Sequence, residues 1–114
     1  LLADRLGAPH AAGVTIADGS GMSRQNTVPA ATFTAWLAEL FRDDDARNLM
    51  LASMPSDGEG TLRDRFSGVE LANDIRAKSG SINGVRCLSG YVISTVNPDR
   101  AIAFSVLVND VEGG

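Results

Sequence analysis

The sequence is poor in the residue types that build metal sites and disulfides. It contains one cysteine and one histidine among 114 residues. A single cysteine excludes an internal disulfide, and one histidine without a nearby cysteine argues against a zinc site, so we expect no metal. His10 is predicted to be a loop residue, and Cys87, in an apolar segment, an inert buried thiol.

Long apolar runs and basic clusters are also missing. No stretch approaches the ~20 apolar residues that a membrane-spanning helix needs, and a net charge of -4 without clustered cations argues against nucleic acid as a partner. The composition is that of one globular domain or part of one. Because the sequence starts without Met in a pattern already under way at Leu1, we expect a segment of a larger polypeptide.

Lysine is nearly absent, which makes its one occurrence informative. Nine arginines accompany the single Lys78, which opens the run Lys78-Ser79-Gly80-Ser81. Arginine replaces lysine easily on a solvated surface, whereas a compact ammonium suits a site that contacts a hydroxyl and a carboxylate together. Taken alone, chance survival of one lysine is the simpler explanation, but a second motif makes Lys78 a candidate for chemistry.

The periodicity predicts helices followed by strands. A helix ends at Gly7, a strand or an extended entry to the following loop covers 14–17, and a long helix follows Pro29 with core residues Phe33, Trp36, Leu37, Leu40 and Phe41. The acidic run 43–45 caps a helix over 46–53 whose inward residues are Leu49 and Met50, and a short helix covers 61–66. Three strands are expected over 74–79, 85–95 and 100–109. This order predicts an α+β fold with helices packed on an antiparallel sheet.

Two motifs and a third, shorter segment carry a family resemblance. Residues 18–26 read DGSGMSRQN, residues 78–92 read KSGSINGVRCLSGYV, and residues 59–66 read EGTLRDRF. Together they resemble the low-molecular-mass class C penicillin-binding proteins, the D-alanyl-D-alanine carboxypeptidase/endopeptidases. The resemblance covers nearly the whole chain and implies part of a penicillin-binding-protein/β-lactamase-like transpeptidase domain.

The resemblance assigns roles to particular residues. Ser23 would relay a proton to the leaving nitrogen, and Lys78 would polarise Ser23 and attract the substrate carboxylate. Ser79 and Ser81 would donate hydrogen bonds to that carboxylate, while Gly80 would leave room for substrate at the edge of the sheet. The implied partners are peptidoglycan stem peptides and β-lactam inhibitors, without cofactor, and the implied location is extracytoplasmic.

The sequence departs from the family pattern in two places. Ser-x-Asn spacing from Ser23 lands on Gln25, and the asparagine comes one residue later, at Asn26; either amide could face substrate. Ser20 is a less suitable start for this motif. A Ser-x-x-Lys nucleophile would need serine at Ile75, so the nucleophile is expected on a companion chain or missing segment.

Three interpretations remain open. The favoured interpretation is that the chain is the C-terminal part of a peptidase domain whose nucleophile lies elsewhere. Alternatively, it is a remnant that binds a β-lactam or peptide without chemistry, or a domain whose motif matches are accidental. A Ser-x-x-Lys segment in the parent polypeptide would separate the first two.

Overall fold

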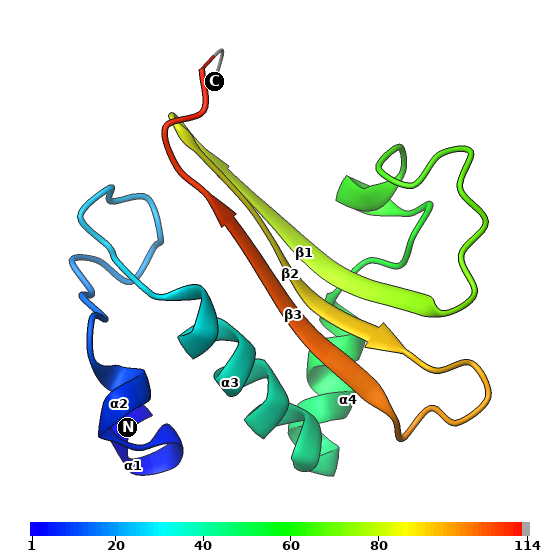
Figure 1. Ribbon diagram of the computed structural model, residues 1–114, viewed down its shortest axis with the longest axis horizontal. Coiled ribbons are helices and arrows are strands. Elements are labelled where there is room, and N and C mark those ends of the chain that lie inside the picture. The colour runs from blue at the N-terminus through cyan, green and yellow to red at the C-terminus, as the bar shows by residue number, and fades with distance from the viewer. Residues whose placement is uncertain (113–114) are drawn as a thin grey trace.

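The computed structural model describes residues 1–112. Helices precede strands in the order α1 (Leu2–Leu6), α2 (Ala8–Ala11), α3 (Ala30–Arg42), α4 (Asp44–Ser53), the 3-10 helix η1 (Gly60–Leu62), β1 (Asp74–Ile82), β2 (Val85–Ile93) and β3 (Ala101–Val108). Figure 1 shows α3 and α4 beside the sheet, with α1 and α2 beyond α3. The predicted α+β fold is confirmed.

The strands form an antiparallel meander in the order β1-β2-β3, with β1 at one edge. A two-residue turn at Asn83-Gly84 joins β1 to β2, and its register pairs Lys78 with Ser89 and Gly80 with Cys87. The first strand was expected to end at residue 79 but continues to Ile82. It continues because cross-strand pairing extends down to the turn, so the Lys78-Ser79-Gly80 run lies within the strand.

The core lies between α3, α4 and one face of the sheet. Leu37, Met54, Tyr91 and Ile93 form its buried cluster. Tyr91 donates a 2.7 Å hydrogen bond to the carbonyl oxygen of Leu37, and its ring lies 5.1 Å from that of Phe41. Since strand side chains alternate between faces, the odd-numbered residues of β2 and the even-numbered residues of β1 face α3.

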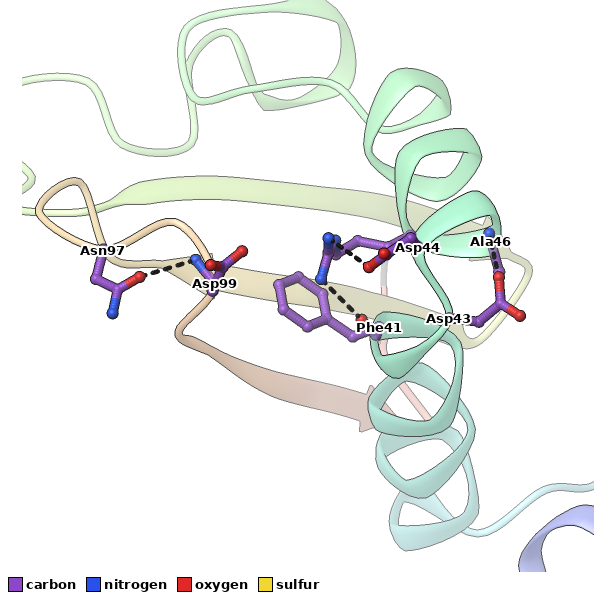
Figure 2. A network of polar contacts seen from close by, with 7 residues as sticks. Phe41, Asp43, Asp44, Ala46, Asn97 and Asp99 are labelled. Atoms are coloured by element: carbon purple, nitrogen blue, oxygen red, sulfur yellow. Dashed lines mark hydrogen bonds and ion pairs between the residues drawn. The ribbon is translucent and has the colours of Figure 1, made fainter.

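The junction between α3 and α4 is fixed by polar contacts (Figure 2). Asp43 accepts a 2.9 Å hydrogen bond from the backbone N–H of Ala46, which confirms the predicted cap. Arg47 donates to Asp44 at 2.8 Å and to the Phe41 carbonyl at 3.4 Å. In the same view, Asn97 accepts from the N–H of Asp99 in the turn before β3.

Several local expectations were wrong. Leu49 is 73% exposed, because the inward stripe of α4 runs through Met50, Leu51 and Met54. Of the two possibilities for 14–17, the strand is wrong: the stretch is an entry to the loop with one isolated bridge at Thr15. His10 lies in α2, which begins with proline in its first turn, and the helix expected over 61–66 is the shorter η1.

The sheet has a second face, opposite α3. There η1 packs against β1, and Leu62 and Ala77 are fully buried. Toward β3 this face carries exposed apolar side chains, with Ile102 at 70% and Val106 at 52% exposure.

Candidate functional site

The first motif is a loop closed at its base by a backbone pair. Thr15 and Thr27 exchange two N–H···O hydrogen bonds of 2.9 Å each. Gly21, near the middle of the loop, has a φ of 76°, a region in which side-chain-bearing residues are strained. The loop therefore projects from a fixed base and turns sharply before α3.

Asp18 is the hydrogen-bonding centre of this loop. Its Oδ1 accepts from Asn26 Nδ2 at 2.7 Å and from the Gly21 N–H at 3.1 Å. Its Oδ2 accepts from Ser20 Oγ and the Ser23 N–H, each at 2.9 Å. These bonds favour the ionised form and hold the pKa of the Asp18 carboxyl below its ordinary value; the bond from Asn26 is the largest cause, and loss of hydration acts the other way.

The other polar residues of the loop are also engaged locally. Ser23 is half-buried, and its Oγ accepts a 3.1 Å hydrogen bond from the N–H of Gln25. Asn26 Oδ1 accepts from the N–H of Ala17 at 2.7 Å and of Asp18 at 3.3 Å. The Asn26 amide thus braces the loop, whereas the exposed Gln25 side chain makes none of the hydrogen bonds found among residues 1–112.

The second motif lies on the edge strand β1. Lys78 is exposed and its Nζ donates a 2.7 Å hydrogen bond to the carbonyl oxygen of Ser79. Lys78 and Gly80 belong to the face of the sheet toward α3, while Ser79 and Ser81 alternate to the other face. Within the described residues, no hydrogen bond joins Lys78 to Ser23.

The outer edge of β1 is partly covered. The N–H of Ala77 points outward and donates to the carbonyl oxygen of Pro55 at 3.2 Å. In an antiparallel strand the backbone groups of alternate residues point to the same side, so those of Ser79 and Ser81 also point outward. Among residues 1–112, no backbone group forms a hydrogen bond with the outward-pointing backbone groups of Ser79 and Ser81.

Gly80 is constrained by its cross-strand neighbour. A Cβ atom built on Gly80 would lie 2.4 Å from Cys87 Sγ. The thiol opposite therefore requires glycine at position 80. This packing requirement is a second reason for the glycine, beside the room that we expect it to leave for substrate. Cys87 itself is half-buried and was wrongly expected to be buried, because its face of the sheet is hollow here.

That hollow is a cavity of about 550 Å³ that brings the two motifs together. Gly21, Met22, Ser23, Arg24 and Asn26 line it from the loop, and Gly80, Ser81 and Cys87 line it from the sheet. Phe33, expected in the core, lies at its wall and is 37% exposed. Lys78, Ser79 and Gln25 do not line this cavity; Lys78 lies on the same face of the sheet, in the next cross-strand row after Gly80.

Arg24 was missed as a site residue although it lies inside the first motif. A Cβ on Gly84 would lie 3.3 Å from Arg24 Nη2, and Gly84 has a φ of 80°. The guanidinium therefore rests against the β1–β2 turn and connects the two motifs. Asn109 and Asp110, which follow β3, also line the cavity, and no sequence signal marked them.

Residues 1–112 contain no group of three histidine, cysteine or acidic side chains placed to hold a metal ion. None of the helices in that range combines the length and apolar character needed to cross a membrane.

Comparisons with known proteins agree with the motifs. The D-Ala-D-Ala carboxypeptidase 3 (S13) family matches residues 6–114. The chain is 37% identical over 108 residues to a D-alanyl-D-alanine carboxypeptidase of Actinomadura sp. strain R39, covering 90% of this chain and 19% of that protein. It is 30% identical over 101 residues to the carboxypeptidase DacB of Haemophilus influenzae, covering 87% of this chain and 21% of that protein.

Comparison with solved structures also finds a penicillin-binding protein. The crystal structure of penicillin binding protein 4 (dacB) from Haemophilus influenzae superposes with a TM-score of 0.72 at 31% identity, covering 90% of this chain and 23% of that one. A complex of that protein with a β-lactam gives a TM-score of 0.71, also at 31% identity, covering 89% and 23%. The chain spans about a fifth of the length of the relatives it matches.

Proposed function

Because this chain belongs to the D-Ala-D-Ala carboxypeptidase 3 (S13) family, we propose that it is part of a serine-type D-Ala-D-Ala carboxypeptidase/endopeptidase acting on peptidoglycan stem peptides. The family match over residues 6–114 carries this proposal. Residues 1–114 would be the C-terminal part of the transpeptidase-like domain. The nucleophilic Ser-x-x-Lys would be supplied by a companion segment.

The reaction would proceed through an acyl-enzyme. The nucleophilic serine Oγ attacks the carbonyl carbon of the penultimate D-Ala, the C–N bond to the terminal D-Ala breaks, and the proton of the serine passes to the leaving amine. Water then hydrolyses the ester and releases the shortened peptide. This chemistry needs a proton relay and a cation for the terminal carboxylate.

Ser23 and Lys78 would supply these two functions. Ser23 lines the cavity wall opposite Gly80, a position that supports a role as relay hydroxyl. Lys78 is exposed and bonded to a carbonyl oxygen of its own strand. Its ammonium can exchange this bond for a substrate carboxylate by side-chain rotation, so we propose that substrate binding draws Lys78 toward the cavity.

The remaining polar groups would hold the substrate. Ser79 and Ser81 present backbone groups at the outer edge of β1, where a peptide can add as a further strand, and their hydroxyls would bind the carboxylate. Of the two candidate amides, the free side chain of Gln25 is better suited to face substrate than Asn26, which is engaged by Asp18.

β-Lactams would acylate the same serine. The relative from Haemophilus influenzae was solved with a β-lactam, and we propose that this protein binds the same class of inhibitor. The proposed substrate is a component of the cell wall, so we propose that the activity lies outside the cytoplasmic membrane.

Intact-mass spectrometry with benzylpenicillin tests the proposal. The whole, undissociated preparation is measured before and after treatment, and its chains are then separated under denaturing conditions. We expect a penicillin adduct on the polypeptide segment that carries Ser-x-x-Lys and none on residues 1–114. Absence of any adduct would refute the enzyme and favour a binding remnant, the alternative raised by Ile75 at the position where Ser-x-x-Lys needs its serine.

A further inference from the structure

The outer edge of β1 is occupied along part of its length by segment 54–56, which follows α4. The carbonyl oxygen of Pro55 accepts a 3.2 Å hydrogen bond from the N–H of Ala77, and Ser56 forms an antiparallel bridge with Arg76. Figure 1 shows the chain leading from α4 past β1 toward η1. The strand position beside this part of β1 is therefore already filled by the chain itself.

We propose that segment 54–56 is a stop for an added peptide strand and thereby determines substrate specificity. It admits a peptide that ends in a free α-carboxylate on the residue after the scissile bond, and it rejects a peptide whose main chain continues beyond that residue. A cross-link through the side chain of that residue would still be admitted. This inference rests on the proposed function, in which substrate pairs with the outer edge of β1 at Ser79 and Ser81.

The distance along the strand sets this limit. Each strand residue advances the chain by 3.2–3.4 Å, so Ala77 and Ser79 lie about 6.5 Å apart along β1. The outer position beside Ala77 belongs to Pro55. A peptide whose terminal carboxylate reaches Ser79 and Lys78 therefore ends just short of Pro55, and further residues would overlap the segment.

The single lysine fixes the direction of the peptide. Lys78 lies in β1 next to the part of the edge that segment 54–56 covers, and in the proposed reaction it attracts the terminal carboxylate. The carboxyl end of the peptide then points toward Pro55 and its amino end toward the turn at Asn83-Gly84. Such a peptide runs antiparallel to β1, as segment 54–56 does at its bridge, so the two would lie end to end in one strand position.

The stop is held from several sides. Met54 is 8% exposed and belongs to the core cluster. Gly60, the first residue of η1, lies against Pro55, since a Cβ built on it would be 3.2 Å from the proline Cβ. Arg76, opposite the segment, donates a 3.4 Å hydrogen bond to the Leu51 carbonyl oxygen of α4. Because packed contacts of this kind yield little, an incoming peptide should not push the segment aside.

The test uses the protein that contains this chain and its nucleophile, with two synthetic peptides. One peptide ends in D-Ala-D-Ala, and the other carries one glycine after the same pair. Mass spectrometry of the products measures terminal cleavage as release of D-Ala from the first peptide, and internal cleavage as release of the dipeptide D-Ala-Gly from the second. In the wild type we expect kcat/KM for internal cleavage to be about 100-fold below that for terminal cleavage, as misplacement of the reacting bond by about 1 Å causes.

A proline exchange tests whether the segment causes this difference. Pro55→Gly frees the backbone of the stop and removes the ring beside Gly60. We expect it to raise kcat/KM for internal cleavage about tenfold and to speed hydrogen exchange of the Ala77 amide. Pro98→Gly, a matched exchange in the exposed turn before β3, should leave both quantities at wild-type values. If Pro55→Gly does not fold, Ser56→Gly loosens the same segment and should give a smaller rise of the same kind.

The outcomes separate this inference from the proposed function. A wild type that cleaves neither peptide and forms no penicillin adduct refutes the proposed function, and the stop falls with it. A wild type that cleaves both peptides at the same rate refutes the stop alone. A Pro55→Gly variant whose Ala77 amide exchanges faster without a gain in internal cleavage also overturns it, since segment 54–56 would then only support the fold.

Discussion

At the scale of single residues, the contrast between Lys78 and Asp18 is instructive. Lys78 drew attention because lysine is otherwise absent, and the structure shows it exposed with one bond to its own strand. Asp18 drew none, although it accepts four hydrogen bonds. Rarity marks a residue in a sequence, whereas the number of partners is visible only in three dimensions.

Lys78→Ala should weaken acylation without changing stability. The exposed ammonium makes no bond that the fold needs, but a charge-assisted hydrogen bond to substrate contributes roughly 1.5–3 kcal/mol, or about 10–100-fold in rate. Measuring benzylpenicillin acylation and thermal unfolding in parallel checks this, with the exposed Arg65→Ala as control. A large loss of stability with normal acylation would contradict the assignment of Lys78.

At the scale of elements, the pairing in the β1–β2 hairpin follows directly from the position of its turn in the sequence. Once the turn is placed at Asn83-Gly84, pairing follows by counting, and Gly80 must face Cys87. The predicted first strand ends at residue 79 and therefore leaves out the pairing of Gly80 with Cys87. The consequence for packing, a thiol that fills the space beside the glycine, depends on the tertiary structure.

Gly80→Ala should be rescued by removing the thiol. The new Cβ would overlap Cys87 Sγ, and such overpacking typically costs about 1–3 kcal/mol. Cys87→Ala in the same protein should recover most of this loss, so a double-mutant cycle on unfolding free energies should give a clear coupling. Gly19→Ala, where a Cβ meets nothing within 4 Å, should change stability little; additive effects at positions 80 and 87 would contradict the proposed overlap.

The hydrogen bond from Tyr91 to the Leu37 carbonyl is a second contact between elements, since it joins β2 to α3. Burial raises the pKa of Tyr91 to about 12. Because the folded-state pKa lies above the unfolded value of about 10, the resulting stability is fully present below pH 10 and is lost as the pH rises toward 12. Tyr91 is the only tyrosine, so ultraviolet titration of phenolate absorbance reports this group alone; a midpoint near 10 in the folded protein would contradict its burial.

Tyr91→Phe isolates the hydrogen bond to Leu37. The ring and its contact with Phe41 would remain, while the 2.7 Å bond to the helix carbonyl would be lost. We expect a decrease of about 0.5–1.5 kcal/mol in unfolding free energy, together with loss of the alkaline destabilisation. Denaturant unfolding at pH 7 and pH 11 measures both quantities, and an unchanged alkaline slope would show that another group titrates.

At the scale of the whole molecule, the two faces of the sheet differ in coverage. One face packs on α3, whereas the other exposes Ile102, Val106 and Val108 on alternate positions of β3. A strand such as β3, AIAFSVLV, has apolar residues at almost every position and so on both faces. Such a near-continuous apolar run is typical of a sheet covered on both sides. In the described residues this second face is covered only near β1, where η1 packs.

The isolated chain should therefore associate through this face. We expect residues 1–114 to bind a hydrophobic dye and to self-associate at micromolar concentration. Replacing Ile102, Val106 and Val108 by threonine keeps strand propensity and should reduce both effects, as analytical ultracentrifugation can measure. Substituting the exposed Leu49 on α4 is the matched control, and equal reduction there would contradict a role for the sheet face.

The sequence by itself determined the helix-then-strand order, the α3 stripe apart from Phe33, the meander and the two family motifs. These follow from local periodicity and from the spelling of short segments, which need no knowledge of distant contacts. It did not determine which residues of the 18–26 loop face the cavity, that Asn26 is engaged by Asp18, or that Lys78 lies beside the cavity instead of lining it. Those outcomes were decided by tertiary structure. The first two depend on hydrogen bonds across the loop, such as that between Asp18 and Asn26, and the last depends on packing between the loop and β1, which lie about 50–60 residues apart in the chain.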